Sequence, residues 1–326
     1  HMHADGEYIV MFRDMSLKLT GVTAADIAAT WHAGKVPAEQ SPVLFSRDKI
    51  LAFAQGRPSE AFGEPYRVFD NQRKIARLPR PPYFFMDRVT KTEPPPWELR
   101  PGGWIEAQYD LPAEEWFLRA DRSGRMPFCI LLEIALQPCG WLAAYLGSAL
   151  KSDQDLKFRY LGGKAILGRN LPPEKQTLTM RSRLSRASEA GDMIIEHFDF
   201  QVLAGDEMLY AGTTYFGFFS QQALANQVGI RGADKLVYTP AEEDAATQPF
   251  YRFPPARPTT PDDPTADPGA GLVMPATALC MLDRIELFEP EGGSRGLGYV
   301  RGTKSVDPDE WFFKAHFYQD PVIPGS

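Results

Sequence analysis

The sequence predicts an α+β fold made of a duplicated unit, in which an antiparallel sheet curls around one central helix. Three observations support this prediction. An apolar run over residues 126–150 is long enough for one buried helix, and segments on both sides of it alternate apolar and polar residues as strands do. Short motifs from the first part of the chain also return in its last part.

The N-terminal residues 1–21 are predicted to be the closing strands of a preceding unit. Asp5-Gly6 is a hairpin signal, and residues 11–19 alternate as a half-buried strand does. The same order of turn and strand returns over residues 204–219, where it closes a domain.

Residues 22–78 are predicted to form a connector. Two short helices are expected in it, over residues 24–32 and 47–55, because each range follows a capping Thr or Ser. His32 lies on the first of these helices, and we interpret it as a surface or packing histidine. The basic residues between 73 and 80 are interpreted as a solvated edge.

Residues 79–220 are predicted to be the first complete unit. The expected strands are 83–89, 97–110, 156–158, 177–184, 193–203 and 208–219. The apolar run between them could be mistaken for a membrane span, but it contains Glu133, and a carboxylate near the middle of a span costs about 2.5–3.5 kcal/mol. We therefore expect a buried helix and no membrane span.

Residues 221–272 are predicted to be a linker, because prolines interrupt a polar, acidic stretch that cannot build a core. Further on, the glycine-rich residues 292–298 resemble a phosphate loop only loosely. They precede a strand, whereas a phosphate loop precedes a helix, so we expect a hairpin turn there.

Residues 273–326 repeat the beginning of the first unit. Residues 86–89 (MDRV) match 282–285 (LDRI), and residues 115–118 (EWFL) match 310–313 (EWFF). Almost the same spacing separates the aspartate from the tryptophan in both copies. The second unit is therefore expected to be half present, ending where its central helix would begin.

The composition excludes several functions. The net charge is -7, which argues against a nucleic-acid-binding surface, since such a surface needs a basic face. Hydrophobic residues make up 44% and charged residues 24%, as in ordinary globular proteins. The three cysteines, Cys129, Cys139 and Cys280, fit neither a disulfide framework nor a zinc site, so we expect no metal and a cytoplasmic location.

The stretch that carries the chemistry is residues 311–326. It places His316 after an aromatic, strand-like run and before a short turn that leads to Pro324-Gly325-Ser326. The last three residues are typical of a helix start, where backbone N–H groups are free. A base that works near neutral pH, beside a helix N-terminus that can hold negative charge, suits proton abstraction next to a carbonyl.

The sequence HFYQDPVIPGS, which begins at His316, resembles the active-site motif of the hot-dog-fold β-hydroxyacyl thioester dehydratases. Residues 307–316 are most similar to the tandem dehydratase regions of bacterial polyunsaturated fatty acid synthases. The resemblance implies a tandem (double) hot-dog fold with its second copy truncated, and dehydration of a β-hydroxyacyl group to a trans-2-enoyl thioester. It also implies that Asp320, Pro321 and Pro324 support the motif and that no cofactor is needed.

The resemblance also implies an acid. Glu133 stands where this family carries its acidic residue, Gln137 matches a substrate-binding position, and the histidine of one hot dog would join the carboxyl of the other. The apolar neighbours of Glu133 predict a raised pKa, so that it can protonate the leaving hydroxyl while His316 takes the α-proton. Backbone N–H groups near Cys129 and Gly325 would hold the enolate-like oxygen.

The two copies differ at the position of the predicted catalytic base. Where the second has His316, the first has Asp121, which we interpret as a structural remnant. Cys129 and Cys139 are interpreted as core thiols. Without the motif, Glu133 would more simply be a glutamate that bonds a backbone group.

Other functions stay open. One alternative is a non-catalytic hot-dog module that shapes or docks a synthase, and the incomplete second unit would then leave the chain inactive. Another is a hot-dog thioesterase, whose carboxylate would act on water. The implied partners are an acyl carrier protein bearing a β-hydroxyacyl phosphopantetheine thioester and other synthase domains, and a homodimer is compatible with the sequence.

Overall fold

The structure is a computed structural model of the 326-residue chain. It describes residues 2–4, 7–10, 42–168, 174–191, 193–226, 238, 240, 251–252 and 275–324. Two units are distinguished, His1–Pro42 and Val43–Ser326. In the first, strands β1 (Met2–Ala4) and β2 (Glu7–Val10) pair antiparallel on either side of the predicted Asp5-Gly6 turn. The helix predicted over 24–32, the strand over 11–19 and His32 lie outside the described residues.

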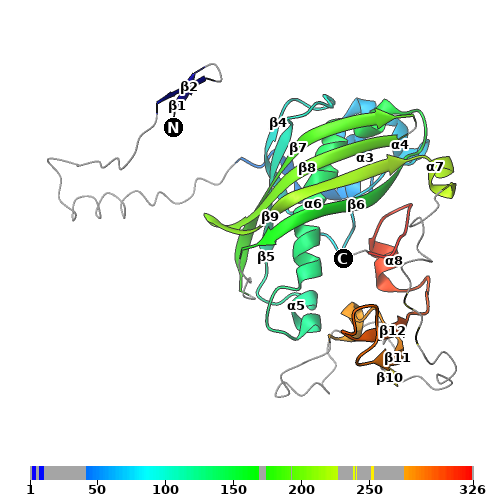
Figure 1. Cartoon of the computed structure of the whole chain (residues 1–326). Coiled ribbons are helices and arrows are strands. Elements are labelled where there is room, and N and C mark those ends of the chain that lie inside the picture. The colour runs from blue at the N-terminus through cyan, green and yellow to red at the C-terminus, as the bar shows by residue number, and fades with distance from the viewer. Residues whose placement is uncertain are drawn as a thin grey trace. The chain divides into compact units, whose positions relative to one another are not determined.

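A seven-stranded sheet curls around one helix in the second unit (Figure 1). The helix is α6 (Phe128–Tyr145). The strands run in the order β3-β4-β5-β7-β8-β9-β6, and all neighbours are antiparallel. Their bounds are β3 (Phe45–Ser46), β4 (Arg88–Glu93), β5 (Trp104–Leu111), β6 (Lys157–Leu167), β7 (Gln176–Ala190), β8 (Met193–Ala204) and β9 (Glu207–Phe219). This is the predicted hot-dog arrangement.

Helix α6 is buried on most of its faces. By length and composition it could cross a membrane, and it is the one such helix among the described residues, but 72% of it is buried inside the protein. Trp141 and Leu142 are fully enclosed, and no charged residue other than Glu133 occurs between Phe128 and Tyr145. The apolar run is therefore the core of the hot dog, as predicted.

The described part of the predicted connector shares this core. Helix α2 (Arg47–Gln55) has the predicted bounds, although the side chain of its N-cap residue makes no capping hydrogen bond. Three short helices follow it: α3 (Pro58–Phe62), η1 (Glu64–Tyr66) and α4 (Val68–Asn71). Ring centroids of Phe53 and Phe62 lie 5.7 and 4.6 Å from that of Trp141 on α6, so these helices close one side of the core.

The second copy is a smaller sheet followed by a helix. Strands β10 (Tyr251–Arg252), β11 (Arg284–Glu289) and β12 (Tyr299–Thr303) pair in that order, and the glycine-rich residues 292–298 form the predicted turn. A 3₁₀ helix, η4 (Thr277–Leu279), precedes β11. Strand β10 and helix α7 (Gln221–Ala225) lie within the predicted linker, and its boundaries stay a prediction.

Residues 311–315 form helix α8 (Trp311–Ala315), so the prediction of a strand-like run there is wrong. The aromatic residues suggested a strand, but the two buried positions are Phe312 and Ala315, which are three residues apart and lie on one helical face. In the first copy the matching residues also form a helix, α5 (Trp116–Asp121).

The duplication extends to individual hydrogen bonds. In each copy the aspartate of the first motif accepts from a backbone N–H at or just after the end of the second strand. The tryptophan indole of each copy donates to a carbonyl that precedes this aspartate. The bonds are Asp110 N–H to Asp87 (2.8 Å), Ser305 N–H to Asp283 (2.6 Å), Trp116 to Pro82 (3.1 Å) and Trp311 to Ala278 (3.1 Å). Both copies also carry a β-bulge at the same place, after Val89 and after Ile285.

The two copies meet through equivalent residues. The Arg80 N–H donates to the Ala315 carbonyl at 2.9 Å, and the Ala276 N–H donates to the Ala120 carbonyl at 2.7 Å. The rings of the two motif tryptophans meet across the same contact, with centroids 5.0 Å apart. Such reciprocal bonding is typical of an isologous interface between like units. It fixes the end of α8, and therefore His316, against the first copy.

Candidate active site

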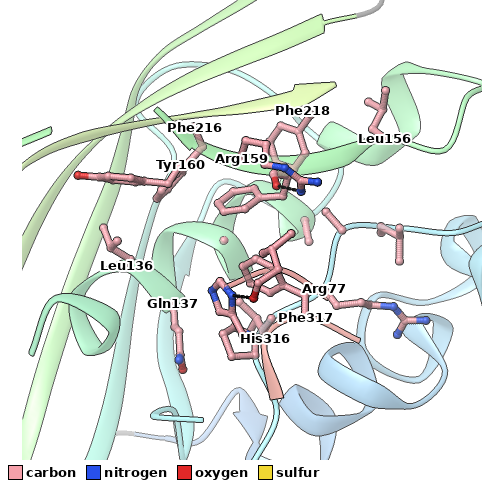
Figure 2. A pocket seen from close by; sticks show the side chains of 18 of the residues that line it. Arg77, Leu136, Gln137, Leu156, Arg159, Tyr160, Phe216, Phe218, His316 and Phe317 are labelled. Carbon is pink, nitrogen blue, oxygen red and sulfur yellow. Dashed lines mark hydrogen bonds between the residues drawn. The ribbon is translucent and has the colours of Figure 1, made fainter. Parts of the chain in front are cut away.

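A cavity of about 280 Å³ lies between α6 and the residues that follow α8 (Figure 2). The second copy contributes His316, Phe317, Val322 and Ile323, and α6 of the first copy contributes Glu133 among others. His316 and Glu133, which the sequence predicts as base and acid, therefore line one cavity, each from a different copy.

His316 is held by its own backbone loop. Its N–H donates to the Phe312 carbonyl at 2.7 Å, and its carbonyl accepts from the Val322 N–H at 2.9 Å. The ring Nδ1 lies 3.1 Å from the Val322 carbonyl oxygen, the bond drawn as a dashed line in Figure 2. Because a carbonyl only accepts, Nδ1 carries the proton, and the lone pair of Nε2 is left for chemistry.

Burial sets the charge of His316. The residue is 7% exposed, and burial lowers the pKa of its imidazole from 6.5 to about 4. The positive charge of Arg159 acts in the same direction, while the hydrogen bond to Val322 and the charge of Asp320 oppose it. At neutral pH the ring is therefore uncharged and can accept a proton.

Asp320 ties the loop after His316 to the first copy. Its carboxylate accepts from Arg159 of β6 at 2.6 Å and pairs with Lys157 of β6 at 3.2 Å. Burial alone would raise the pKa of Asp320, but the hydrogen bonds and charges of these two cations hold it below its usual value. Of the other motif residues, Pro321 is exposed and Pro324 is half-buried, whereas Gly325 lies outside the described residues.

Glu133 occupies the second turn of α6 and is 8% exposed. Cys129, one turn before it, lies where backbone N–H groups have no carbonyl within the helix. Cys129 is half-buried and is not among the residues that line the cavity, and burial raises the pKa of its thiol. The predicted oxyanion-binding role near this residue stays a prediction.

Gln137 lines the cavity, and its amide is bonded at both ends. The side-chain oxygen accepts from the Phe85 N–H at 2.8 Å, and the side-chain nitrogen donates to the Tyr83 carbonyl at 2.9 Å. Gln137 is 2% exposed, and its two hydrogen bonds attach α6 to residues 83–85, which lead into β4. Its predicted role in binding substrate stays a prediction.

Asp121, which stands in the first copy where the second has His316, is the last residue of α5. It does not line the cavity, and its carboxylate accepts from the backbone N–H of Ser123 at 3.3 Å. This local bond agrees with the structural role we expected.

Sequence reasoning missed the wall formed by residues 74–79. The interpretation of residues 73–80 as a solvated edge is wrong for Arg77, which is 5% exposed and donates to the Phe53 and Gly56 carbonyls at the end of α2, at 2.7 and 3.0 Å. The basic cavity residue Arg159 was also missed. The sequence gives little indication of this residue, because no local pattern in β6 shows that Arg159 would form an ion pair with Asp320.

Among the residues that the structure describes, no group of three or more His, Cys, Asp or Glu side chains is placed to hold a metal ion.

Known proteins resemble this chain over different lengths. Residues 274–326 match the FabA-like domain. Over 290 residues, which are 85% of this chain, the sequence is 32% identical to a polyunsaturated fatty acid synthase polypeptide of Thraustochytrium sp. (strain ATCC 26185 / S-3). The chain spans 19% of the length of that relative. These matches confirm the resemblance indicated by the motif that begins at His316.

Two solved structures align with part of this chain. The dehydratase heterocomplex ApeI:P from Xenorhabdus doucetiae aligns with a TM-score of 0.36 and 13% identity, over 46% of this chain and 93% of that chain. A probable thioesterase from Bartonella henselae aligns with a TM-score of 0.30 and 16% identity, over 37% and 94%. Both scores lie below 0.5, so neither structure decides between the two activities.

Proposed function

We propose that this chain, whose residues 274–326 match the FabA-like domain, removes water from β-hydroxyacyl thioesters and leaves trans-2-enoyl thioesters. One observation carries the proposal. His316 from the second copy and Glu133 from the first line one cavity, as a base and an acid that serve one substrate must.

His316 acts as the base. Its Nδ1–H bond to the Val322 carbonyl fixes the ring, so that Nε2 can take the proton from the carbon next to the thioester carbonyl. The low pKa of the buried ring keeps it in the form that can accept this proton.

Glu133 acts as the acid. The electrons of the broken α C–H bond form the new double bond, the β C–O bond breaks, and the hydroxyl leaves with the proton of Glu133 as water. The imidazolium then loses its proton and the carboxylate regains one, so the enzyme returns to its starting state. No oxidant, reductant or metal is needed for this balance.

We also propose an acyl carrier protein as the carrier of the substrate and a cytoplasmic site of action. The similarity to part of a synthase supports the carrier, because the thioester would then be handed between domains of one assembly. The net charge of -7 means that an acidic carrier would need a local basic surface.

The test uses a β-hydroxyacyl pantetheine thioester and mass spectrometry of the products. The wild-type chain should form the enoyl thioester, and His316→Asn and Glu133→Gln should each lose about 10²–10⁴-fold in rate. His197→Asn is the matched control, since that ring stacks on Tyr215 with centroids 5.2 Å apart and does not line the cavity.

Three outcomes contradict the proposal. Dehydration that survives both cavity substitutions removes the roles of His316 and Glu133. Release of free acid identifies a thioesterase, and a folded protein without turnover identifies a non-catalytic module.

A further inference from the structure

The imidazole of His316 lies against the ring of Phe317, the next residue in the chain. The two ring centroids are 3.9 Å apart and the ring planes are inclined by 31°, so Phe317 covers one face of the imidazole. Tyr83 also meets this imidazole, but its ring is nearly perpendicular to it, with an interplanar angle of 81° and centroids 6.0 Å apart. Of these two rings, Phe317 is the one whose face is turned towards the base.

Phe317 is held in this place by the first copy. Its ring meets that of Phe158 on β6, with centroids 5.8 Å apart, and Phe158 in turn packs on Phe216 of β9 with centroids 4.7 Å apart. The residue after Phe158 is Arg159, whose guanidinium binds the carboxylate of Asp320 at 2.6 Å. A ring contact and an ion pair thus attach the loop that carries Phe317 to β6, and they keep its ring against the imidazole.

The imidazole needs support when it becomes charged. Burial and the positive charge of Arg159 disfavour the imidazolium, whereas the Val322 carbonyl and the Asp320 carboxylate favour it. The help from Asp320 is reduced, because its charge is shared with Arg159 and Lys157.

Few anionic groups surround this part of the cavity. Its charged and titratable side chains are Lys74 and Arg77 before β4, Glu133 on α6, Arg159 and Tyr160 on β6, and Asp320 in the loop itself. Of these, Asp320 is the one that is negative when the proposed reaction begins, since Glu133 starts as an uncharged acid. A further source of stabilisation for the imidazolium therefore has to be uncharged.

An aromatic face supplies stabilisation of this kind. The π electrons make the face of a phenyl ring negative, and a cation within about 6 Å of the ring centroid is attracted to it. The attraction is larger where water is excluded, and His316 is 7% exposed. An uncharged imidazole gains much less from the same contact. The contact therefore strengthens as Nε2 takes the proton, and an interaction that strengthens in this way speeds a chemical step.

We infer that Phe317 is a positioning residue, whose ring fixes the imidazole of His316 and stabilises the imidazolium that forms when Nε2 takes the α-proton, an inference that rests on the proposed dehydratase function. Phe317 itself neither gives nor takes a proton. Because the substrate binds while the imidazole is still uncharged, loss of the aromatic face should lower kcat and leave KM almost unchanged.

The experiment changes the face of this ring and keeps an apolar side chain in its place. Phe317→Leu removes the aromatic face, and pentafluorophenylalanine at position 317 keeps the shape of the ring and reverses the charge of its face. Phe317→Tyr retains the face and should behave as the wild type does. Phe313→Leu is the matched control, because that ring packs on Phe312 with centroids 4.7 Å apart and does not line the cavity.

Two quantities are measured on these proteins. Nuclear magnetic resonance of the His316 ring, assigned with His316→Asn, gives the pKa, which is about 4 in the wild type. Phe317→Leu and the fluorinated protein should show a pKa that is lower by about 0.5–1.5. With a β-hydroxyacyl pantetheine thioester, these two proteins should lose about 3–30-fold in kcat, and their KM should stay within about twofold of the wild-type value.

The outcomes separate this inference from the proposed function. An unchanged or raised pKa of His316 in both altered proteins overturns the inference, whether or not dehydration occurs. The same loss in Phe313→Leu, or a loss that appears in KM in place of kcat, also overturns it. A lowered pKa in a chain that forms no enoyl thioester supports the contact between the two rings and contradicts the proposed dehydratase. The fluorinated protein keeps the test decisive if Phe317→Leu does not fold.

Discussion

The buried imidazole of His316 makes the stability of the protein depend on pH in a specific way. Its pKa is about 4 in the folded chain and 6.5 when unperturbed. Above pH 6.5 the ring is neutral in both states, and it adds no pH dependence. As the pH falls from 6.5 towards 4, the unfolded chain binds a proton that the folded chain does not, so the free energy of unfolding falls.

The size of the effect follows from the shift. The lowering of the pKa from 6.5 to about 4 corresponds to about 3 kcal/mol of the free energy of unfolding. The protein loses this contribution between pH 6.5 and about pH 4, where the folded ring also becomes protonated. His316→Asn removes the titration and keeps a donor that can reach the Val322 carbonyl. The variant should therefore lose less stability between pH 7 and pH 4 than the wild type does, by about 3 kcal/mol.

Urea unfolding followed by circular dichroism, at several pH values in that range, measures this difference. Carboxylates that titrate in the same range contribute equally to both proteins, so they cancel in the comparison. Parallel stability curves for the wild type and His316→Asn would refute the account of a buried, neutral base.

Three further substitutions test neighbouring parts of the structure. Gln137→Leu leaves the backbone groups of Tyr83 and Phe85 unpaired, and thermal unfolding should show a loss of about 2–4 kcal/mol. Burial raises the pKa of Glu196 from 4.5 to about 7, so the free energy of unfolding falls as the pH rises through this range. Glu196→Gln does not titrate, and its free energy of unfolding should therefore rise relative to that of the wild type between pH 5 and pH 8. Urea unfolding measures this difference. Asp320→Asn frees the loop after His316 from β6, and the rate of dehydration should fall at least tenfold while the fold is retained in circular dichroism spectra.

The sequence was sufficient for the parts of the fold that depend on local patterning. The apolar run around Trp141 and the paired Asp and Trp motifs predict structure that is present, and residues 2–4 pair antiparallel with residues 7–10. Helix α8 was mistaken for a strand, because aromatic residues favour strands and only the contact with the first copy shows which of its faces is buried.

Two residues of the candidate site were predictable from the sequence, whereas most of its walls were not. The motif pointed to His316 and the resemblance to Glu133, and both residues line the cavity, while their roles as base and acid stay predictions. The clamp between Asp320 and Arg159 joins residues that are 161 positions apart, so no local pattern could indicate it. The same is true of Leu78 and Gly140, which both line the cavity, since they look like ordinary core positions in the sequence.

The central claim is that a base from one copy and an acid from the other serve one reaction. A double-mutant comparison of dehydration rates, with His316→Asn, Glu133→Gln and both changes together, tests it most directly. Groups that act as a unit are not additive, so the double variant should be at most about tenfold slower than the slower single variant. Losses that multiply, or a single variant that keeps the wild-type rate, would contradict the shared site.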